Sequence, residues 1–381
     1  MKNRYTDNNR ISFLGGRKAV IINFTADSYH WGCYGTSMEI YHTLLESNYY
    51  IDTISVNAVH SISPSIEKAD DFNSDSFFTT YCNANLEMCR TLQTADLIVV
   101  NGEGTLHRMN KAPLNLLYLM LICKKYFQKP VLLINFSCFP NGDASALEKQ
   151  TMLYPQILKH MDQVTARESM SFNLLQNAGV KAQLGFDCLP RFLKRHKLTN
   201  THTPEGHVLI SGGVSLAEED LSFFASLIDL LSQKGIAVRY LTGAKSHPAN
   251  EDAKFWENLK IRTDTKNVKF VMADTMLDWV DELRTASFLF SARFHHTIAA
   301  LSIGTPFGHF ESNTPKISAA LQTLNEPSET VFKNQEGLDA LLGQITSAVD
   351  CKVTNKCETR VNLMTDLAAK NFILFNEHQK A

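Results

Sequence analysis

The sequence has no paired cysteines and no other recognisable metal-ligand spacing. Its eight cysteines are scattered through mostly apolar stretches, and no two of them form a C-x-x-C pair. Such spacing favours reduced thiols in the cytoplasm over a disulfide framework or a zinc site. No H-E-x-x-H spacing occurs either, so we expect no bound metal and no cofactor.

Long hydrophobic runs are also absent. The most apolar stretch, residues 114–123, is far shorter than the roughly 20 residues that span a bilayer. Residues 1–10 are polar and do not form the hydrophobic core of a signal peptide. We therefore expect a cytoplasmic protein without a transmembrane segment, while a peripheral contact with the inner face of the membrane stays open.

An excess of charge of one sign is missing as well. The 37 basic and 39 acidic side chains give a net charge of −2, which offers no electrostatic basis for nucleic-acid binding. With 381 residues, 44% of them hydrophobic, the chain is long enough for two globular domains. An anion-binding site must therefore come from a local cluster of cationic groups.

What the sequence does contain is a regular alternation of short apolar runs with amphipathic segments. Runs such as 19–24, 96–100 and 131–135 are typical of buried parallel strands. The alternation breaks at about 186–206, where we expect a linker, and it restarts at 208–211. This pattern predicts an α/β fold of two Rossmann-like domains, with parallel sheets that face each other across a cleft.

The break in the pattern sets the predicted domain boundaries. We place an N-terminal domain at 1–188, a C-terminal domain at 207–350 and, at 351–381, a helix that could pack back on the first domain. Within the first domain we interpret 60–85 as a surface excursion and 146–160 as a helix.

The strongest chemical signal follows the predicted strand 287–290. Arg293, His295 and His296 lie where this strand turns into a helix that is predicted from Thr297 onward. Ligands of doubly wound sheets bind at such strand ends, where backbone N–H groups and the helix dipole favour an anion. Adjacent histidines diverge by about 100° on a helix, so we favour Arg293 and His295 as the working pair.

A second candidate lies after the strand at 96–100. Asn101, Gly102, Glu103 and Gly104 form a glycine-bearing turn that places one carboxylate at the ligand edge of the sheet. The turn is not a dinucleotide fingerprint, because the third glycine of that motif is missing.

Further polar residues follow other predicted strands. His247 comes after the strand at 236–241, and Gly212 and Gly213 come after 208–211. Arg167 opens a helix, which it could cap, or its guanidinium could reach the cleft. Asp187 could be an acid of the cleft or a turn residue, and we favour the turn.

Several of these segments together resemble one family. Ser291 to Pro306 resembles the S-x-R-x-H…A…G-x-P segment of the polysaccharide pyruvyl transferases, and Pro315-Lys316-Ile317 resembles their P-K-I/V element. The strand and glycine turn at 96–104, the helix that Arg167 opens, and Phe186-Asp187 are similar to further family elements. The resemblance covers most of residues 19–325.

The resemblance implies a GT-B-like fold and a specific reaction. Pyruvate would pass from phosphoenolpyruvate, as the donor substrate, to a sugar of a cell-surface glycan or a lipid-linked precursor, where it forms a ketal. The catalytic groups would be Arg293, His295 and Glu103. The donor-binding residues would be Arg293, His295, His247, Gly212, Gly213 and Lys316. The acceptor-binding residues would be Asn101, Gly102, Gly104, Asp27 and Arg167, with Asp27 an alternative base to Glu103.

Two other functions remain open from the sequence. A GT-B glycosyltransferase would use a nucleotide-activated sugar, such as a CMP-linked one, and the Lys245-Ser-His-Pro248 stretch is reminiscent of such enzymes. A non-catalytic glycan-binding module is less favoured, because ionisable groups follow three separate predicted strands.

Overall fold

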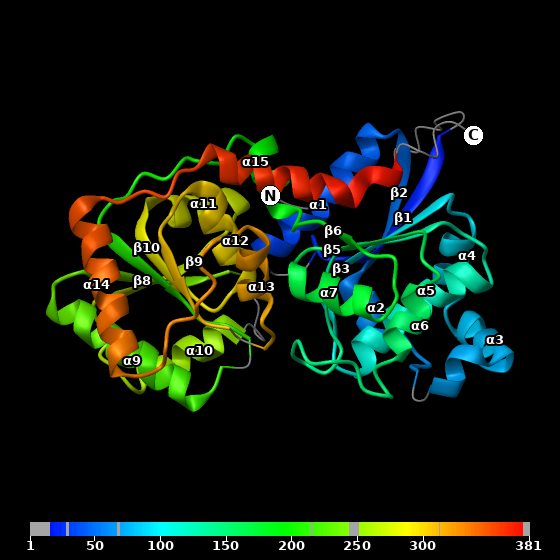
Figure 1. The fold of residues 1–381 in the computed structure, drawn as a ribbon, viewed down its shortest axis with the longest axis horizontal. Helices are drawn as coiled ribbons and strands as arrows, with labels where there is room; N and C mark the ends of the chain where they lie inside the picture. The colour runs from blue at the N-terminus through cyan, green and yellow to red at the C-terminus, as the bar shows by residue number, and fades with distance from the viewer. Residues whose placement is uncertain are drawn as a thin grey trace.

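Two parallel sheets carry the fold (Figure 1). Each sheet has a hydrophobic core on both of its faces. The computed structural model describes residues 16–27, 30–66, 69–214, 216–243, 251–311 and 313–375. In the first sheet, Val20 and Ile22 face one core, while Ala19 and Ile21 face the other. Burial on both faces is the reason why these fully apolar runs form central parallel strands.

Each sheet defines one lobe of the molecule. The first lobe has six parallel strands in the order β2-β1-β3-β4-β5-β6, and the second has five in the order β11-β10-β7-β8-β9. The strands of the first lobe are β1 (Arg17–Phe24), β2 (Tyr49–Ser55), β3 (Leu97–His107), β4 (Val131–Phe139), β5 (Gln163–Ala166) and β6 (Gln183–Leu184). Those of the second lobe are β7 (His207–Ser211), β8 (Ala237–Thr242), β9 (Val268–Met272), β10 (Ala286–Ser291) and β11 (Phe307–His309). The predicted fold class is confirmed.

Helices connect the strands in both lobes. The first lobe contains α1 (Trp31–Glu46), α2 (Val56–Ser61), η1 (Ala69–Asn73), α3 (Asp75–Ala84), α4 (Leu86–Gln93), α5 (Lys111–Lys125), α6 (Leu153–Leu158), α7 (Ser169–Asn177) and α8 (Leu189–Arg195). The remaining helices are α9 (Glu218–Gln233), α10 (Glu251–Lys260), α11 (Met276–Thr285), α12 (Phe294–Ile303), α13 (Lys316–Thr323), α14 (Gln335–Cys351), α15 (Glu358–Ala369) and η2 (Lys370–Phe375). Across the described residues, none of these helices combines the length and the apolar character needed to cross a lipid bilayer.

Each sheet has one switch point, where the chain changes the side on which it adds strands. In the first lobe β2 and β3 flank β1, and in the second lobe β8 and β10 flank β7. At a switch point the loops that leave two neighbouring strands run in opposite directions, which opens a crevice at the strand ends. The segments that follow β1, β7 and β10, together with residues within β3, line the site described below.

Two local expectations were wrong. The stretch 60–85 is not a plain surface excursion but contains helices, because Phe72 and Tyr81 are buried against Tyr118 of α5. Of the helix expected at 146–160, only α6 forms. Pro155 lies in the first turn of α6, because a proline disfavours helical backbone in the residues that precede it. The expected linker does run between the two sheets, and it contains the partly buried helix α8.

One apolar cluster joins the two lobes. It contains Trp31 of α1 and Phe192 of α8 together with Trp279 of α11 and Ile298 of α12. The indole N–H of Trp31 also donates to the backbone oxygen of Ala273, at 3.0 Å. Because a large apolar interface resists relative motion of domains, this shared cluster fixes the two sheets relative to each other.

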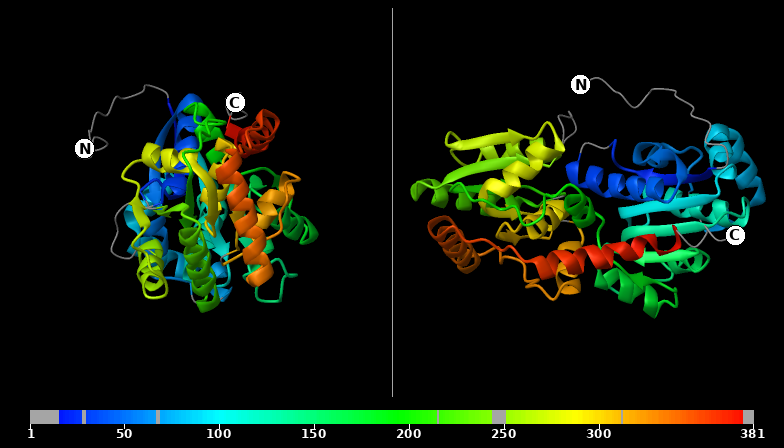
Figure 2. Two further views of the ribbon diagram at one scale, coloured as in Figure 1. Left: turned by 90° about the vertical axis from the view of Figure 1, so that its left-hand side faces the viewer. Right: turned by 90° about the horizontal axis from the view of Figure 1, so that it is seen from above.

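The C-terminal segment crosses from the second lobe to the first (Figure 2). Helix α15 contacts α8 and α12, and η2 contacts β5. Asn371 Oδ1 accepts from the backbone N–H of Asn135 at 2.8 Å, and its amide donates to the oxygen of Phe186 at 2.9 Å. Phe372 and Phe375 join the core below β1 and β3. The C-terminal segment therefore connects the two lobes through its contacts with both of them.

Candidate active site

One pocket, which we call the interdomain pocket, is lined by residues of both lobes and has a volume of about 150 Å³. Its lining residues are His30, Cys33, Glu103, Gly104, Arg167, Val214, Ala292, Arg293, Phe294, His295 and Lys316. The structure thus brings together six of the residues predicted from the sequence. These six are Glu103, Gly104, Arg167, Arg293, His295 and Lys316.

Arg293 lies at the N-cap of α12. Its backbone N–H donates to Ser291 Oγ at 3.0 Å, which fixes the turn between β10 and the helix. The helix begins at Phe294, earlier than the sequence predicted, so His295 lies in its first turn. Arg293 Nε and Nη2 donate to Asp252 Oδ1 at 2.9 and 2.5 Å, and both side chains are buried. The carboxylate therefore orients a guanidinium that lines the interdomain pocket.

Arg167 is held on three sides at the end of β5. Its Nη1 donates to Asp187 Oδ2 at 2.8 Å and its Nε donates to Ser137 Oγ at 3.0 Å. The guanidinium carbon lies 4.1 Å from the ring centre of Phe294, within the range of a cation–π contact. The side chain of Glu168, not that of Arg167, caps α7. Of the two alternatives left open by the sequence, the structure therefore favours the position in the cleft.

His295 lies between a thiol and a carboxylate. Its Nδ1 is 3.8 Å from Cys33 Sγ, and its Nε2 is 3.6 Å from Asp187 Oδ2. Burial acts to raise the pKa of Asp187, but His295 and Arg167 together hold that pKa below its usual value. Asp187 also accepts from the backbone N–H of Leu189 at 2.9 Å. It is thus a turn residue, as favoured from the sequence, and also the buried anionic partner of Arg167 and His295.

His296, the neighbour of His295, is buried in the second lobe. Its ring centre lies 5.6 Å from that of Trp279, and its Nδ1 lies 3.3 Å from Ser291 Oγ. Burial, and then the charge of Arg293, lower the pKa of His296 well below its usual value. A neutral, packed imidazole is a structural group, so the two adjacent histidines have different environments.

Lys316 supplies a third cationic group at the start of α13. Its Nζ donates to Asn313 Oδ1 at 2.8 Å. Desolvation, and then the charge of Arg167, lower the pKa of Lys316 to about 8. A lysine with this pKa is mostly charged at neutral pH, so it can bind an anion together with Arg167 and Arg293.

Glu103 is the carboxylate of the first lobe that lines the interdomain pocket. The backbone there is not a loop, as expected, but part of β3, with a positive φ of 40° at Glu103. Such a backbone costs a non-glycine residue on the order of 1–3 kcal/mol. Its Oε1 accepts hydrogen bonds from Thr25 Oγ1, from Thr36 Oγ1 at 2.9 Å and from Asn101 Nδ2 at 3.1 Å. These three hydrogen bonds hold the strained residue in place and fix the direction in which the Glu103 side chain points.

Two predicted acceptor residues lie behind Glu103. Asn101 Oδ1 accepts from Asn135 Nδ2 at 2.8 Å, so Asn101 links β4 to the Glu103 carboxylate. A Cβ at Gly102 would lie 2.4 Å from Phe136 Cβ, which explains the glycine by its contact with β4. Within the described part of the chain, neither residue lines the interdomain pocket.

The remaining predicted residues are also outside the lining. Asp27 is exposed in the turn after β1. Gly212 and Gly213 follow β7 and are buried, and the backbone oxygen of Gly212 accepts from Ala292 N–H at 3.2 Å. His247 lies outside the described residues.

Sequence reasoning missed three residues of the site that carry ionisable side chains. Asp252, the partner of Arg293, lies in a helix without any motif. His30 and Cys33 open the first helix after β1. Their place after the first strand of a Rossmann-like sheet was the available signal, because ligands bind at that position.

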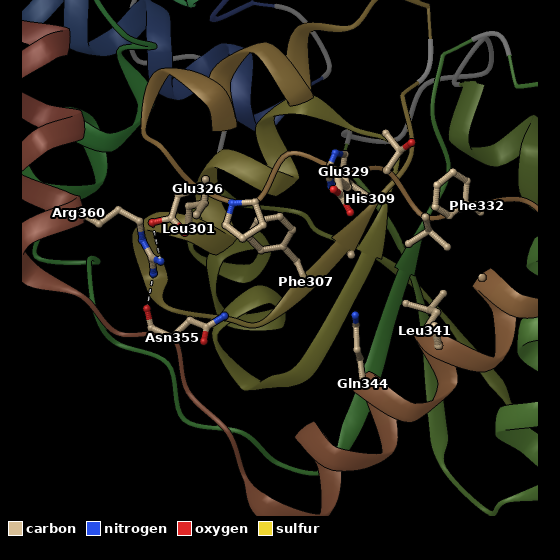
Figure 3. A pocket seen from close by; sticks show the side chains of 16 residues that line it. Leu301, Phe307, His309, Glu326, Glu329, Phe332, Leu341, Gln344, Asn355 and Arg360 are labelled. Carbon is tan, nitrogen blue, oxygen red and sulfur yellow. Dashed lines mark hydrogen bonds and ion pairs between the residues drawn. The ribbon is translucent and has the colours of Figure 1, made fainter.

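A larger cavity of about 580 Å³ lies elsewhere in the second lobe, beside the edge strand β11 (Figure 3). Leu301, Phe307 and Leu341 line it together with the ion pair of Arg360 and Glu326. None of the predicted site residues is among its described lining residues. Its size therefore does not make it the candidate active site.

The chain matches a family model over most of its length. The model, described as polysaccharide pyruvyl transferase, matches residues 14–314. The chain belongs to the polysaccharide pyruvyl transferase family. Both sheets lie within the matched range, as do ten of the eleven lining residues, with Lys316 just beyond it. As a member of the polysaccharide pyruvyl transferase family, the protein is a transferase.

Solved structures with a similar fold act on or bind UDP-sugars. A UDP co-structure of MnaA from S. aureus has a TM-score of 0.56 and 11% identity, over 95% of this chain and 94% of that one. A putative UDP-N-acetylglucosamine 2-epimerase from Listeria monocytogenes has a TM-score of 0.55 and 12% identity, over 96% and 97%. Alr3699/HepE from Anabaena, in complex with UDP and glucose, has a TM-score of 0.53 and 11% identity, over 95% and 98%. Likeness at such identities shows the shared GT-B-like fold alone. No curated protein matches the chain in sequence.

Proposed function

We propose that the protein transfers pyruvate from phosphoenolpyruvate to a sugar of a cell-surface glycan or its precursor, and leaves it there as a ketal. Membership of the pyruvyl transferase family supports the reaction class. The observation that supports the donor is the meeting of Arg167, Arg293 and Lys316 around one small pocket. Phosphoenolpyruvate carries a phosphate and a carboxylate, and both are recognised by charge-assisted hydrogen bonds from such groups.

The size of the interdomain pocket supports a small donor. Its volume is about 150 Å³. Pockets for drug-sized ligands, which are comparable with a nucleotide sugar, measure roughly 300–1,000 Å³. The N-terminus of α12 adds a helix dipole that favours an anion next to Arg293.

The proposed chemistry begins with a proton transfer to the donor. The π electrons of its double bond form a C–H bond at the methylene carbon, so the neighbouring carbon becomes oxocarbenium-like. We assign the proton to His295, because Asp187 lies 3.6 Å from its Nε2 and would stabilise the imidazolium. The cationic groups around the phosphate would stabilise the charge that develops as it leaves.

Attack by the sugar requires a base. In the proposal Glu103 accepts the proton of the attacking hydroxyl, because it lines the interdomain pocket from the opposite lobe, whereas Asp27 is exposed. The phosphate then departs with the electron pair of its C–O bond. A second hydroxyl of the same sugar adds to the same carbon and loses its proton, which completes the ketal. This scheme requires no metal.

The proposed setting is the biosynthesis of an exopolysaccharide for the cell envelope, on the cytoplasmic side. A lipid-linked acceptor would bring the protein to the inner face of the membrane as a peripheral protein. The eight cysteines are free thiols in the structure, which is the usual state in a reducing compartment.

The donor is tested by ligand-dependent thermal stability. Phosphoenolpyruvate is compared with CMP, UDP and GDP on the wild type and on Lys316→Met. Lys316 is the cationic group to change because it donates to the neutral Asn313, whereas Arg293 and Arg167 pair with buried carboxylates. Lys266→Met, at a side chain that is 87% exposed, is the matched control.

Binding to the native state alone raises stability by RT ln(1 + [L]/Kd), so a millimolar donor should give a measurable shift. We expect a shift with phosphoenolpyruvate in the wild type and in Lys266→Met, and little or none in Lys316→Met. A shift with a nucleotide and none with phosphoenolpyruvate would refute the proposal in favour of a nucleotide-sugar glycosyltransferase.

A further inference from the structure

Three ligand-type side chains of the interdomain pocket converge on one point. His30 precedes α1, Cys33 lies in its first turn, and His295 lies in the first turn of α12. One ligand atom from each of them lies within 4.8 Å of the others. We propose that His30, Cys33 and His295 bind one thiophilic divalent cation, with Zn²⁺ as the probe ion, between the two lobes.

The distances are close to those of a tetrahedral zinc site. Zinc bonds of about 2.3 Å to sulfur and about 2.0–2.1 Å to nitrogen place neighbouring S and N ligands roughly 3.6 Å apart. Cys33 Sγ and His295 Nδ1 are 3.8 Å apart, so this pair needs almost no movement. The ligand atoms of the three residues lie within 4.8 Å of one another, so His30, whose ring centre is 5.9 Å from that of His295, has to approach by about 1 Å.

An independent observation comes from the far side of the His295 ring. Its Nε2 is 3.6 Å from the fully buried carboxylate of Asp187, while its Nδ1 faces Cys33. Histidines that bind metals commonly donate their second ring N–H to a carboxylate, which fixes the tautomer and the orientation of the ring. Asp187 therefore faces the second ring nitrogen of His295 and would accept its N–H after a small approach.

The charges around the cluster do not exclude a cation. Arg293 and Arg167 are each paired with a buried carboxylate, Asp252 and Asp187 respectively. Lys316 also lines this pocket, and the carboxylate of Glu103, which lines it beside Cys33, offsets its positive charge. Binding replaces the S–H bond of Cys33 by an S–metal bond and releases one proton to solvent.

Three protein ligands leave the fourth tetrahedral position open toward the pocket. An ion that occupies His295 Nδ1 removes that nitrogen from proton transfer. Metal binding and the acid role of His295 are therefore mutually exclusive, a consequence that rests on the proposed function, whereas the binding site itself does not.

The binding site is tested without any donor or acceptor. Full-length protein is freed of metal with a chelator, titrated with Zn²⁺ and with Co²⁺, and compared with Cys33→Ser, His30→Asn and the control Cys351→Ser. Cys351 is an exposed thiol in α14, far along the chain from the cluster. Thermal melts of each variant without metal establish that it is folded.

We expect one ion per chain in the wild type and in Cys351→Ser, with a thiolate-to-cobalt charge-transfer band in the ultraviolet. Cys33→Ser should lose that band, and both Cys33→Ser and His30→Asn should bind at least tenfold more weakly. Either no bound ion in the wild type or unchanged binding in both variants overturns the proposal.

The consequence for catalysis has its own readout. One equivalent of Zn²⁺ should suppress pyruvyl transfer by the wild type, and a chelator should restore it. Full transfer activity with the ion bound would overturn the mutual exclusion but not the binding site. If phosphoenolpyruvate fails to bind while the cobalt band is present, the proposed function fails and the metal site stands.

Discussion

Replacement of Gly32 by alanine should displace His295. Gly32 lies in the first turn of α1, and a Cβ built there would be 2.1 Å from His295 Cβ and 2.3 Å from its Cγ. Carbon atoms in contact are normally about 3.5–4.0 Å apart, so the shortfall is about 1.5 Å. Since the Cβ of His295 is fixed to the backbone of α12, a side-chain rotation cannot remove the clash. The two helices have to separate.

The expected magnitude has two parts of opposite sign. Alanine is favoured over glycine in a helix by about 1 kcal/mol. Forcing atoms into a packed core costs roughly 1–3 kcal/mol, and the shared apolar cluster around α1 and α12 adds to this cost when the helices move apart. The expected result is a net loss of about 1–2 kcal/mol in the free energy of unfolding.

Gly343→Ala is the matched control. Gly343 lies in α14, and a Cβ there would meet no heavy atom within 4 Å, so this variant should gain up to about 1 kcal/mol. Urea denaturation measures both variants. In a transfer assay, Gly32→Ala should lose on the order of 100-fold in kcat/KM, as a misplacement of about 1 Å can cause. Equal stability of the two variants, with an unchanged rate, would refute the close approach of α1 to His295.

Three further predictions concern charge and the C-terminal segment. Donor binding should weaken as pH rises through about 8, because Lys316 loses its proton there. Isothermal titration at pH 7 and pH 9 measures this loss of affinity, and Lys316→Arg should abolish the pH dependence. Asp252→Asn should lower the free energy of unfolding, measured in urea, by about 3–5 kcal/mol, because buried Arg293 loses its counter-ion. The double variant with Arg293→Met should regain most of this stability. Asn371→Ala should cost roughly 3 kcal/mol by the same measurement, since it leaves buried backbone groups of β4 and of the β6–α8 connection without partners. A loss below about 0.5 kcal/mol for Asn371→Ala would show that water replaces the amide.

The alternation of apolar runs was sufficient to predict both sheets, because strands buried on both faces leave an unmistakable pattern. The alternation was not sufficient to predict the short polar helices after β2. Phe72 and Tyr81 fix these helices by packing on Tyr118, and such a tertiary contact has no local signature in the sequence. The late start of α6, by contrast, was readable from Pro155.

The site was predicted in part for a similar reason. Arg293 and His295 follow β10, and Glu103 follows the apolar run at the start of β3, so the rule that ligands bind at strand ends located them. Asp252 lies in the same lobe as Arg293 but in a helix whose sequence carries no motif, and Cys33 meets His295 only because the two lobes approach each other. The roles given to individual residues remain predictions until the variants above are measured.

The apolar cluster shared by the lobes has a consequence for how the chain folds. Trp31, Phe186 and Leu189 of the first lobe contribute to the same core as Trp279 and Ile298 of the second. A fragment that ends after α8 would expose these large side chains to water and would tend to aggregate. We therefore expect that neither lobe folds on its own. Heat or urea should unfold both sheets in one transition. A chimera in which one lobe comes from a related protein should fold only if α1, α8, α11 and α12 are exchanged together.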